Sequence, residues 1–159
     1  MSAPRRQAGM TLVELVVVIA LLGLIASLTF PAASAGIDSL RLRQVTSELV
    51  SFFNQGLDRA ERRQQVVQVS ISKAQRTLWL HSSEPGFERK LVLPDGISIV
   101  RVLPEIDSAE EDALREFALY PGGAVPRLGI EISNERRVHR LVQVDPMTGV
   151  PQVEEVQAP

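Results

Sequence analysis

The chain begins with a nearly continuous apolar segment. The run from Leu15 to Phe30, extended by the small residues 32–35, is close to the roughly 20 residues that span a bilayer as a helix. Arg5 and Arg6 precede this run without a neighbouring acid, which predicts a cytoplasmic N-terminus. Residues 10–35 are therefore predicted to form a transmembrane helix.

The pattern after residue 36 indicates that the helix continues in amphipathic form. Apolar residues recur there at steps of three and four, which is the spacing of one helix face. They are Leu42, Val45, Leu49, Phe52, Phe53, Leu57 and Ala60. Residues 36–64 are thus predicted to pack one face on a sheet. Arg59, Arg62 and Arg63 near the end of this segment allow two interpretations, a solvated last turn that suits the helix dipole or a ligand-binding patch.

Beyond Val66 the apolar residues alternate with polar ones, which is typical of β-strands. Residues 67–72 and 77–80 form the clearest predicted hairpin, around a turn at 73–76. Further predicted strands cover residues 90–93, 97–103, 117–120, 127–132 and 138–144, with an edge strand in 150–159. Turn signals occur at Pro-Asp-Gly 94–96, Pro-Gly-Gly 121–123 and Pro-Met-Thr-Gly 146–149.

These elements predict an α+β fold. A long N-terminal helix is expected to pack on an antiparallel sheet, and residues 65–159 form the β-rich globular domain. At 159 residues the chain has room for one modest domain beyond its anchor. It has no cysteine, so its stability does not rest on disulfides.

The charge balance argues against a surface that coats nucleic acid broadly. The formal net charge is -2, with 17 basic and 19 acidic residues. Loss of residues 1–9, which contain Arg5 and Arg6, would leave 15 basic and 19 acidic residues, a net charge of -4. A local basic patch remains compatible with this composition.

One carboxylate, that of Glu14, lies near the start of the apolar run. A lone charge in hydrocarbon costs about 3 kcal/mol or more, so such a group usually has a partner and a function. The alternative is that Glu14 reaches the headgroups from near the helix end. An ordinary secretory signal, cleaved after Ala33-Ser34-Ala35, and a plain membrane anchor are two further interpretations of this region.

The segment Gly9-Met10-Thr11-Leu12-Val13-Glu14-Leu15, followed by the long apolar run, resembles the signal of type IV pilins and type II secretion pseudopilins. The resemblance implies that a prepilin peptidase removes a leader of residues 1–9. Cleavage would fall between Gly9 and Met10, and Met10 would be N-methylated. Proteins of this kind usually begin the mature chain with Phe, so Met10 is a mild departure.

The same resemblance implies roles for Glu14 and Pro31. Cleavage creates an α-amino group on Met10 that is positive or partly so near neutral pH. The carboxylate of Glu14 would meet this group on a neighbouring subunit, which offsets the desolvation of both charges. Pro31 falls where many of these proteins carry a helix-bending proline.

Later parts of the chain resemble the H-type minor pseudopilins of type II secretion, which are grouped with the FimT-type pilins. The matching stretches are Arg59-Ala60-Glu61-Arg62-Arg63, Tyr120-Pro121-Gly122-Gly123, Val144-Asp145 and Thr148-Gly149. The resemblance implies a minor pseudopilin at or near the tip of the periplasmic pseudopilus that drives protein export. The alternative is a minor pilin of a type IV pilus or DNA-uptake filament.

This resemblance also implies partners and a location. The partners would be the prepilin peptidase, other major and minor pseudopilins and the inner-membrane assembly platform. The protein would cross the bacterial inner membrane once, with a cytoplasmic N-terminus and a periplasmic globular domain.

The sequence offers little support for catalysis. His81 and His139 lie on different predicted strands without a ligand-like cluster, so we expect strand-surface or satisfied core residues. Trp79 is predicted to lie in the sheet core. Residues 105–116 are predicted to form an acidic surface loop or short helix. Weak calcium binding is the alternative for its acids, Asp107, Glu110, Glu111 and Asp112, although their spacing is not that of an EF-hand. We expect no enzymatic activity, no cofactor and no metal.

Within the predicted globular domain, the most basic segment contains Arg136, Arg137, His139 and Arg140. Arginines in such a segment could grip phosphates in a DNA-uptake pilin. The cluster is short, aromatic residues for base stacking are scarce, and acids follow at 154–155. A charged hairpin turn is therefore the preferred interpretation, and nucleic acid is not expected as a partner.

Overall fold

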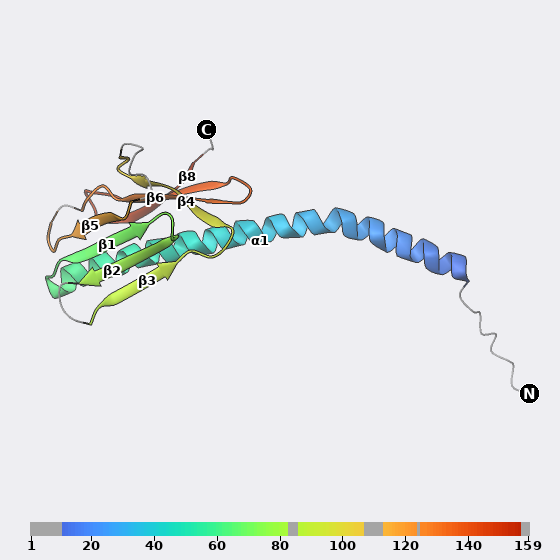
Figure 1. Cartoon of the computed structure of the whole chain (residues 1–159), viewed down its shortest axis with the longest axis horizontal. Helices are drawn as coiled ribbons and strands as arrows, with labels where there is room; N and C mark the ends of the chain where they lie inside the picture. Colours follow the sequence, from blue (N-terminus) through green and yellow to red (C-terminus); the bar gives the residue numbers. More distant parts are fainter. Residues whose placement is uncertain (1–10, 83–85, 107–112, 124, 157–159) are drawn as a thin grey trace, which may run out of the picture. The chain divides into compact units, whose positions relative to one another are not determined.

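The computed structural model describes residues 11–82, 86–106, 113–123 and 125–156, with the side chains of residues 28–35 left out of the description. The chain divides into two compact units, residues 1–37 and residues 38–159. Within the described residues there are one helix and eight strands (Figure 1). They are α1 (Leu12–Arg63), β1 (Val67–Ser72), β2 (Thr77–Ser82), β3 (Glu88–Val92), β4 (Ile97–Leu103), β5 (Arg115–Leu119), β6 (Gly129–Asn134), β7 (His139–Val144) and β8 (Pro151–Val156). The predicted α+β class is confirmed.

The first unit contains the N-terminal part of α1. Its large apolar side chains are exposed from Leu12, at 78%, through to Ile25, at 60%. No helix in the described part of the chain is long and apolar enough to cross a membrane.

In the second unit, α1 buries one face against the sheets. The buried residues follow the predicted steps of three and four, and Leu57 alone of the predicted set is half-buried. They are Leu42, Val45, Leu49, Phe52, Phe53 and Ala60. Gly56 lies on the same face, and a Cβ built there would stand 3.0 Å from Leu80 Cδ2 and 3.1 Å from Leu119 Cδ1. A residue without a side chain therefore lets the helix approach the sheet closely at this point.

The helix ends in a Schellman-type cap. Gln64 has φ of 53°, in the left-handed region, and the N–H of Gln65 donates to the carbonyl of Ala60 at 3.1 Å. The side chain of Gln64 donates to the carbonyl of Glu61 at 2.7 Å. These bonds satisfy carbonyls that the helix end would otherwise leave unpaired, and the chain turns directly into β1.

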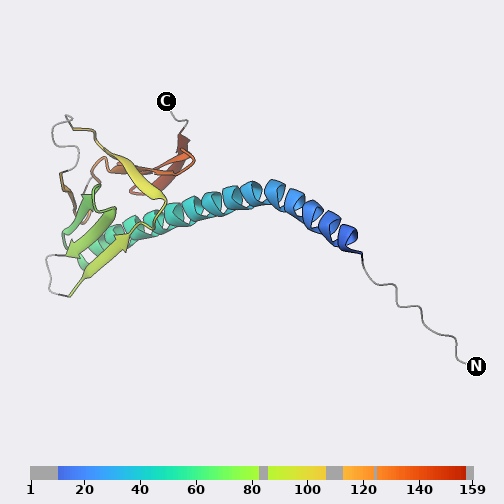
Figure 2. The same ribbon diagram turned by 45° about the vertical axis from the view of Figure 1, so that its right-hand side comes forward.

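The strands form two four-stranded antiparallel sheets. The first, sheet A, has the order β3-β2-β1-β5, and the second, sheet B, has the order β4-β6-β7-β8. In Figure 2, β1, β2 and β3 of sheet A are green to yellow-green, and sheet B runs from β4 in yellow to β8 in red. Two neighbouring pairs, β1–β5 and β4–β6, join strands that are not consecutive in the chain.

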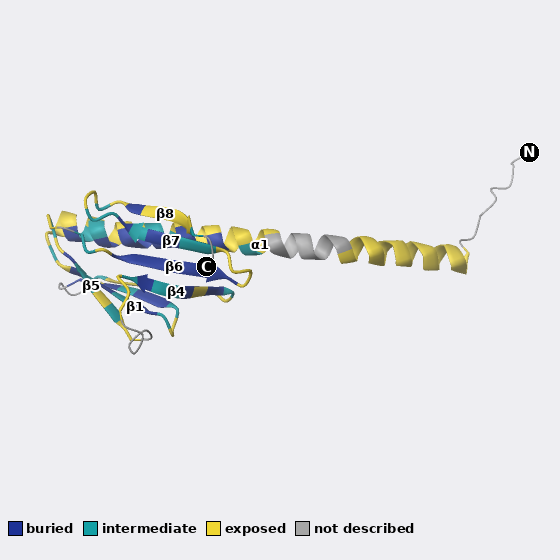
Figure 3. Ribbon diagram, turned by 90° about the horizontal axis from the view of Figure 1, so that it is seen from above, coloured by how far each residue is buried: buried dark blue, intermediate teal, exposed yellow. Residues whose placement is uncertain are grey.

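One hydrophobic core serves both sheets and the helix. It combines Phe53 of α1 with residues of sheet A such as Leu78 and residues of sheet B such as Ile130. All six residues of β6 are buried, and the strand appears dark blue along its length in Figure 3. Since β6 lies between β4 and β7, burial on both of its faces places any polar side chain it carries in a dry environment.

Most predicted strands are confirmed, with shifts at their ends. The strand predicted at 97–103 matches β4, and the hairpin of 67–72 and 77–80 is formed by β1 and β2. The prediction of loop or short helix through residue 116 was wrong at its end, because β5 begins at Arg115. Cross-strand pairing with Ile71 and Ser70 of β1 draws Arg115 and Glu116 into the sheet.

The prediction that Trp79 lies in the sheet core was also wrong. Trp79 is half-buried, and its neighbours Leu78 and Leu80 fill the core instead. Since side chains alternate along a strand, Trp79 lies on the other face of sheet A, where the ammonium of Lys90 stands 5.9 Å from its ring centroid.

Candidate functional site

The first candidate site is the N-terminal turn of α1. Thr11 caps this turn, since its carbonyl accepts from the N–H of Leu15 at 3.2 Å. Its hydroxyl oxygen accepts from the N–H of Glu14, also at 3.2 Å. The order Thr-x-x-Glu is that of a capping box, in which the acid occupies the third helical position. Glu14 is therefore held in the first turn, where the positive end of the helix dipole favours a carboxylate.

Apolar side chains surround the helix after Glu14. Every described side chain from Leu15 to Ser27 is exposed, and residues 15–19 are all aliphatic, which covers the full circumference of a helix. The Ser27 hydroxyl donates to the carbonyl of Leu24 at 2.8 Å, so this polar group is satisfied within the helix. A helix that is hydrophobic all round requires apolar surroundings, either lipid or other helices.

Some predicted site residues lie outside the described residues. Gly9 and Met10, the predicted cleavage and methylation sites, belong to this group. Position 31 lies within α1, but the side chain of Pro31 is not described, so its bending role stays a prediction. Asp107, Glu110, Glu111 and Asp112 of the acidic segment also lie outside the described residues, so weak calcium binding by these acids stays a prediction. The pairing of Glu14 with another subunit also stays a prediction.

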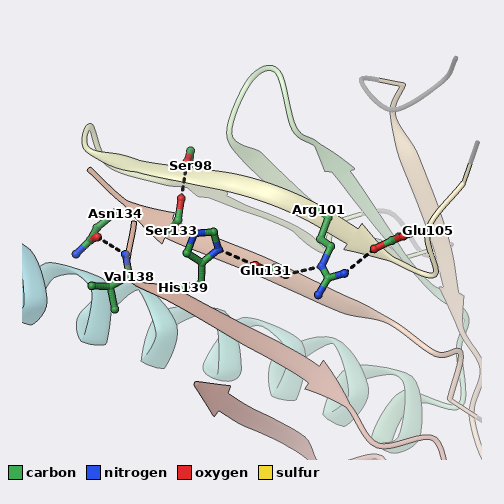
Figure 4. Close-up of polar contacts among 8 residues, drawn as sticks. All are labelled: Ser98, Arg101, Glu105, Glu131, Ser133, Asn134, Val138 and His139. Carbon is green, nitrogen blue, oxygen red and sulfur yellow. Dashed lines mark hydrogen bonds and ion pairs between the residues drawn. The ribbon is translucent and has the colours of Figure 1, made fainter. Parts of the chain in front are cut away.

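The second candidate site is a polar cluster on sheet B around Glu131 of β6 (Figure 4). The side chain of Glu131 is 3% exposed. Its Oε1 lies 2.7 Å from Nδ1 of His139 on β7, and its Oε2 accepts from Nε of Arg101 on β4. A second nitrogen of Arg101 donates to Glu105 at 2.6 Å. Both oxygens of a buried carboxylate are thus satisfied from the two neighbouring strands.

The electrostatics of this cluster favour the ionised carboxylate. Burial raises the pKa of Glu131, but the hydrogen bonds from His139 and Arg101 outweigh burial, and the pKa lies below its ordinary value. The pKa of Arg101 is raised by its hydrogen bonds to Glu105 and Glu131. The cluster therefore acts as a clamp between β4, β6 and β7, in which both oxygens of Glu131 are engaged.

Sequence reasoning missed Glu131 as an important residue. It placed His139 correctly as a satisfied residue, since this side chain is 12% exposed and bonded to Glu131. A signal was present, because Glu131 is a single acid between two isoleucines in a strand that proves to be central. Among the described residues, no group of three or more His, Cys, Asp or Glu side chains is placed to hold a metal ion.

The basic segment at 136–140 occupies the β6–β7 hairpin turn and the start of β7. Arg136 Nε donates to Asp38 Oδ2 at 3.0 Å, and Arg140 donates to Glu155 at 2.7 Å. Arg137 is exposed in the turn, with φ of 59°. Asn134 closes this turn by accepting the N–H groups of Arg136 and Val138. The structure thus brings a carboxylate to two of the three arginines.

Comparison with known proteins identifies one match. Residues 4–30 match the family described as the prokaryotic N-terminal methylation motif. No curated protein matches the chain, and no solved structure matches it. The matched region contains the capped turn, Glu14 and most of the exposed apolar helix. The N-terminal methylation motif, together with the helix-and-sheet fold, indicates a type IV pilin-like protein that is processed as a prepilin and anchored in a membrane.

Proposed function

We propose that the chain is a minor pseudopilin of a type II secretion system. In this proposal, prepilin peptidase cleaves between Gly9 and Met10, and the mature chain joins a periplasmic pseudopilus that drives protein export. The single observation that carries the proposal is the methylation motif at residues 4–30. It runs into a helix whose apolar side chains are exposed on all sides, which suits contact with lipid and with the helices of neighbouring subunits.

The second unit, residues 38–159, supports a structural role in this proposal. Glu131, a buried carboxylate, is engaged in holding strands together between Arg101 and His139. We therefore propose that the chain has no catalytic activity and no cofactor. Its partners would be the prepilin peptidase, the inner-membrane assembly platform and other pseudopilins, reached from a single-pass position in the inner membrane.

The experiment that tests processing is mass analysis of the protein purified from its own membranes. The proposal expects a chain that begins with N-methylated Met10. The choice of filament needs a second measurement, which is secretion in a strain that lacks the gene. Loss of export with normal surface pili favours the pseudopilus, whereas loss of pili with normal export favours a pilus.

The alternative is a minor pilin of a type IV pilus or DNA-uptake filament. Its candidate contact residues are Arg136, Arg137 and Arg140, and two of these are paired with acids, which weakens their attraction for phosphates. Salt-dependent DNA binding that disappears when all three become alanine would favour this alternative. Absence of DNA binding at low salt would count against a DNA-uptake filament.

A further inference from the structure

Four arginines gather at the C-terminal end of α1, away from the sites described above. Arg59, Arg62 and Arg63 come from the last two turns of the helix, and Arg89 comes from β3. Together with Gln55, Asp58 and Phe87 they line a surface hollow of about 300 Å³. We refer to Arg59, Arg62, Arg63 and Arg89 as the helix-end arginine cluster.

The register of sheet A explains why Arg89 faces the helix. Arg89 lies opposite Leu80 of β2, and Leu80 is buried against α1. Directly opposed residues share a face of the sheet, so Arg89 lies on the helix side. Glu88, its neighbour in the strand, lies opposite His81 and belongs to the other face. The alternation thus adds a cation to this side and places the adjacent acid on the far one.

Among the described residues, the acids nearest to the cluster do not neutralise it. Among the lining residues, Asp58 is the one acid beside four cations, and it pairs with Arg62 at 3.1 Å. Both partners of that pair are largely exposed, at 65% and 78%, so it is a weak interaction. The carboxylate of Glu61 is directed elsewhere, since it accepts the N–H of Gly122 at 2.9 Å.

Arg59 is held in a fixed position at the hollow. Its guanidinium lies over the ring of Phe87, 4.9 Å from the centroid, which fixes the side chain in place. Its Nε is buried and has no hydrogen-bond partner within the described structure. A buried donor left unpaired is destabilising, but Nε is covered by protein, so a ligand would meet the part of Arg59 that lines the hollow.

A solvated helix end accounts for only part of this arrangement. Cations in the last turn suit the negative end of the helix dipole, which explains Arg62 and Arg63. The dipole does not explain Arg89, which comes from a strand, or the unpaired Nε of Arg59. The convergence of two elements on one hollow points instead to an anionic ligand.

We propose that the helix-end arginine cluster is a docking site for a carboxylate-rich segment of a partner protein. Guanidinium groups bind carboxylates through paired, charge-assisted hydrogen bonds, and a hollow of this size admits a few such groups. Arg89 lies on β3, an edge strand with mostly exposed residues, so an extended acidic segment can approach it from the open side.

Two other anionic partners fit the observations less well. Lipid headgroups would meet this unit where the chain leaves its apolar segment, near Asp38, and Arg59 lies about 32 Å further along the helix at 1.5 Å per residue. Nucleic acid is a long polyanion, and this chain has a formal net charge of -2. A short acidic segment needs only the local cluster. The inference goes beyond the proposed function, because it holds for any filament.

The test measures binding of a fluorescein-labelled peptide of six glutamates to the full chain in neutral detergent, by fluorescence anisotropy at low salt. The variant Arg62→Gln/Arg63→Gln/Arg89→Gln removes three exposed cations of the cluster and keeps Arg59. The control Arg43→Gln/Arg127→Gln/Arg137→Gln removes three exposed cations elsewhere, so both variants have the same net charge.

We expect the cluster variant to bind the peptide about tenfold or more weakly than the wild type, and the control less than about twofold more weakly. The variant Arg62→Lys/Arg63→Lys/Arg89→Lys should retain part of the affinity, because lysine keeps the positive charge but lacks the planar guanidinium that binds a carboxylate through two hydrogen bonds. Absence of binding by the wild type, or equal losses in both variants, would overturn the proposal. The assignment to a protein segment would be overturned by preference for anionic over neutral vesicles, or by tighter binding of a single-stranded oligonucleotide than of the peptide, if that binding is lost in the cluster variant.

Discussion

The hydroxyl of Thr11 caps the turn that contains Glu14, by accepting the backbone N–H of Glu14 at 3.2 Å. Glu14 is the one charged residue between Thr11 and Ile37 in the sequence. The cap fixes this carboxylate at the start of α1 and leaves the rest of the apolar helix uncharged. If the chain is cleaved after Gly9, the new α-amino group lies four residues before this carboxylate in the sequence, so the mature chain begins with charges of opposite sign close together.

From this arrangement we predict that Glu14→Ala leaves cleavage intact and impairs assembly. The α-amino group of a neighbouring subunit would lose its partner, and an unpaired buried charge costs a few kcal/mol, so incorporation should fall by about tenfold or more. Peptide mass analysis detects the cleavage, and the amount of cross-linked filament measures the assembly. Glu14→Asp keeps the charge and should retain more assembly than Glu14→Ala. Wild-type assembly in Glu14→Ala would refute the pairing.

A second prediction concerns the buried carboxylate of Glu131. Glu131→Ala leaves the half-buried His139 without its partner and should lower the free energy of unfolding by about 1–3 kcal/mol. Glu105→Ala is the matched control, because Glu105 also binds Arg101 but is 61% exposed, and it should cost less than about 1 kcal/mol. Thermal unfolding of the full chain in neutral detergent measures both values. Equal effects would mean that the burial of Glu131 has no energetic consequence.

The pH dependence of stability follows from the same residue. The pKa of Glu131 is lowered from 4.5 in the folded protein, so the folded state favours the ionised carboxylate. Its contribution is therefore complete above pH 4.5 and is lost as the pH falls below that value, through the folded pKa. Unfolding measured between pH 7 and pH 3 should show a steeper loss for the wild type than for Glu131→Gln. Parallel curves would contradict the assignment.

The close contact between α1 and sheet A gives a fourth prediction. Gly56→Leu introduces a side chain where Leu80 and Leu119 already stand closer to a built Cβ than van der Waals contact, at 3.0 and 3.1 Å. Overpacking of this kind costs about 1–3 kcal/mol, which exceeds the gain of about 1 kcal/mol in helix propensity. Ser47→Leu, at an exposed position of the same helix, is the control and should leave the melting temperature nearly unchanged. Equal melting temperatures for the two variants would show that the helix can move away from the sheet.

Local patterns in the sequence predict the elements of this fold well. The steps of three and four that place Leu49 and Phe53 on one face of α1 depend only on residues close in the chain, and both are fully buried. The alternation in residues 67–72 predicts β1 for the same reason. A period of two shows that one face of a strand is apolar, and it contains no information about which strand lies alongside.

What the sequence could not predict depends on pairing between distant residues. The β1–β5 and β4–β6 pairings bring together residues from 26 positions apart, as in Leu103 and Gly129, to 52 positions apart, as in Val67 and Leu119, and they decide which strand is central. The burial of Glu131 follows from the central place of β6, and the position of Trp79 follows from the register of β2. The helix-end arginine cluster depends in the same way on the register that places Arg89 opposite Leu80.

The N-terminal motif differs from these cases, because its meaning does not depend on the fold. It lies in 27 residues, 4–30, that carry their own order of charged, small and apolar positions. The structure adds the cap by Thr11 and the exposed apolar surface, neither of which is evident from the motif alone.

The measurement that tests this account most directly is the intact mass and N-terminal peptide of the protein purified from its own membranes. We predict a chain that begins with N-methylated Met10 and lacks residues 1–9. A chain that begins at Met1 or at Gly36 would contradict prepilin processing, and the filament mechanism proposed for Glu14 would fall with it.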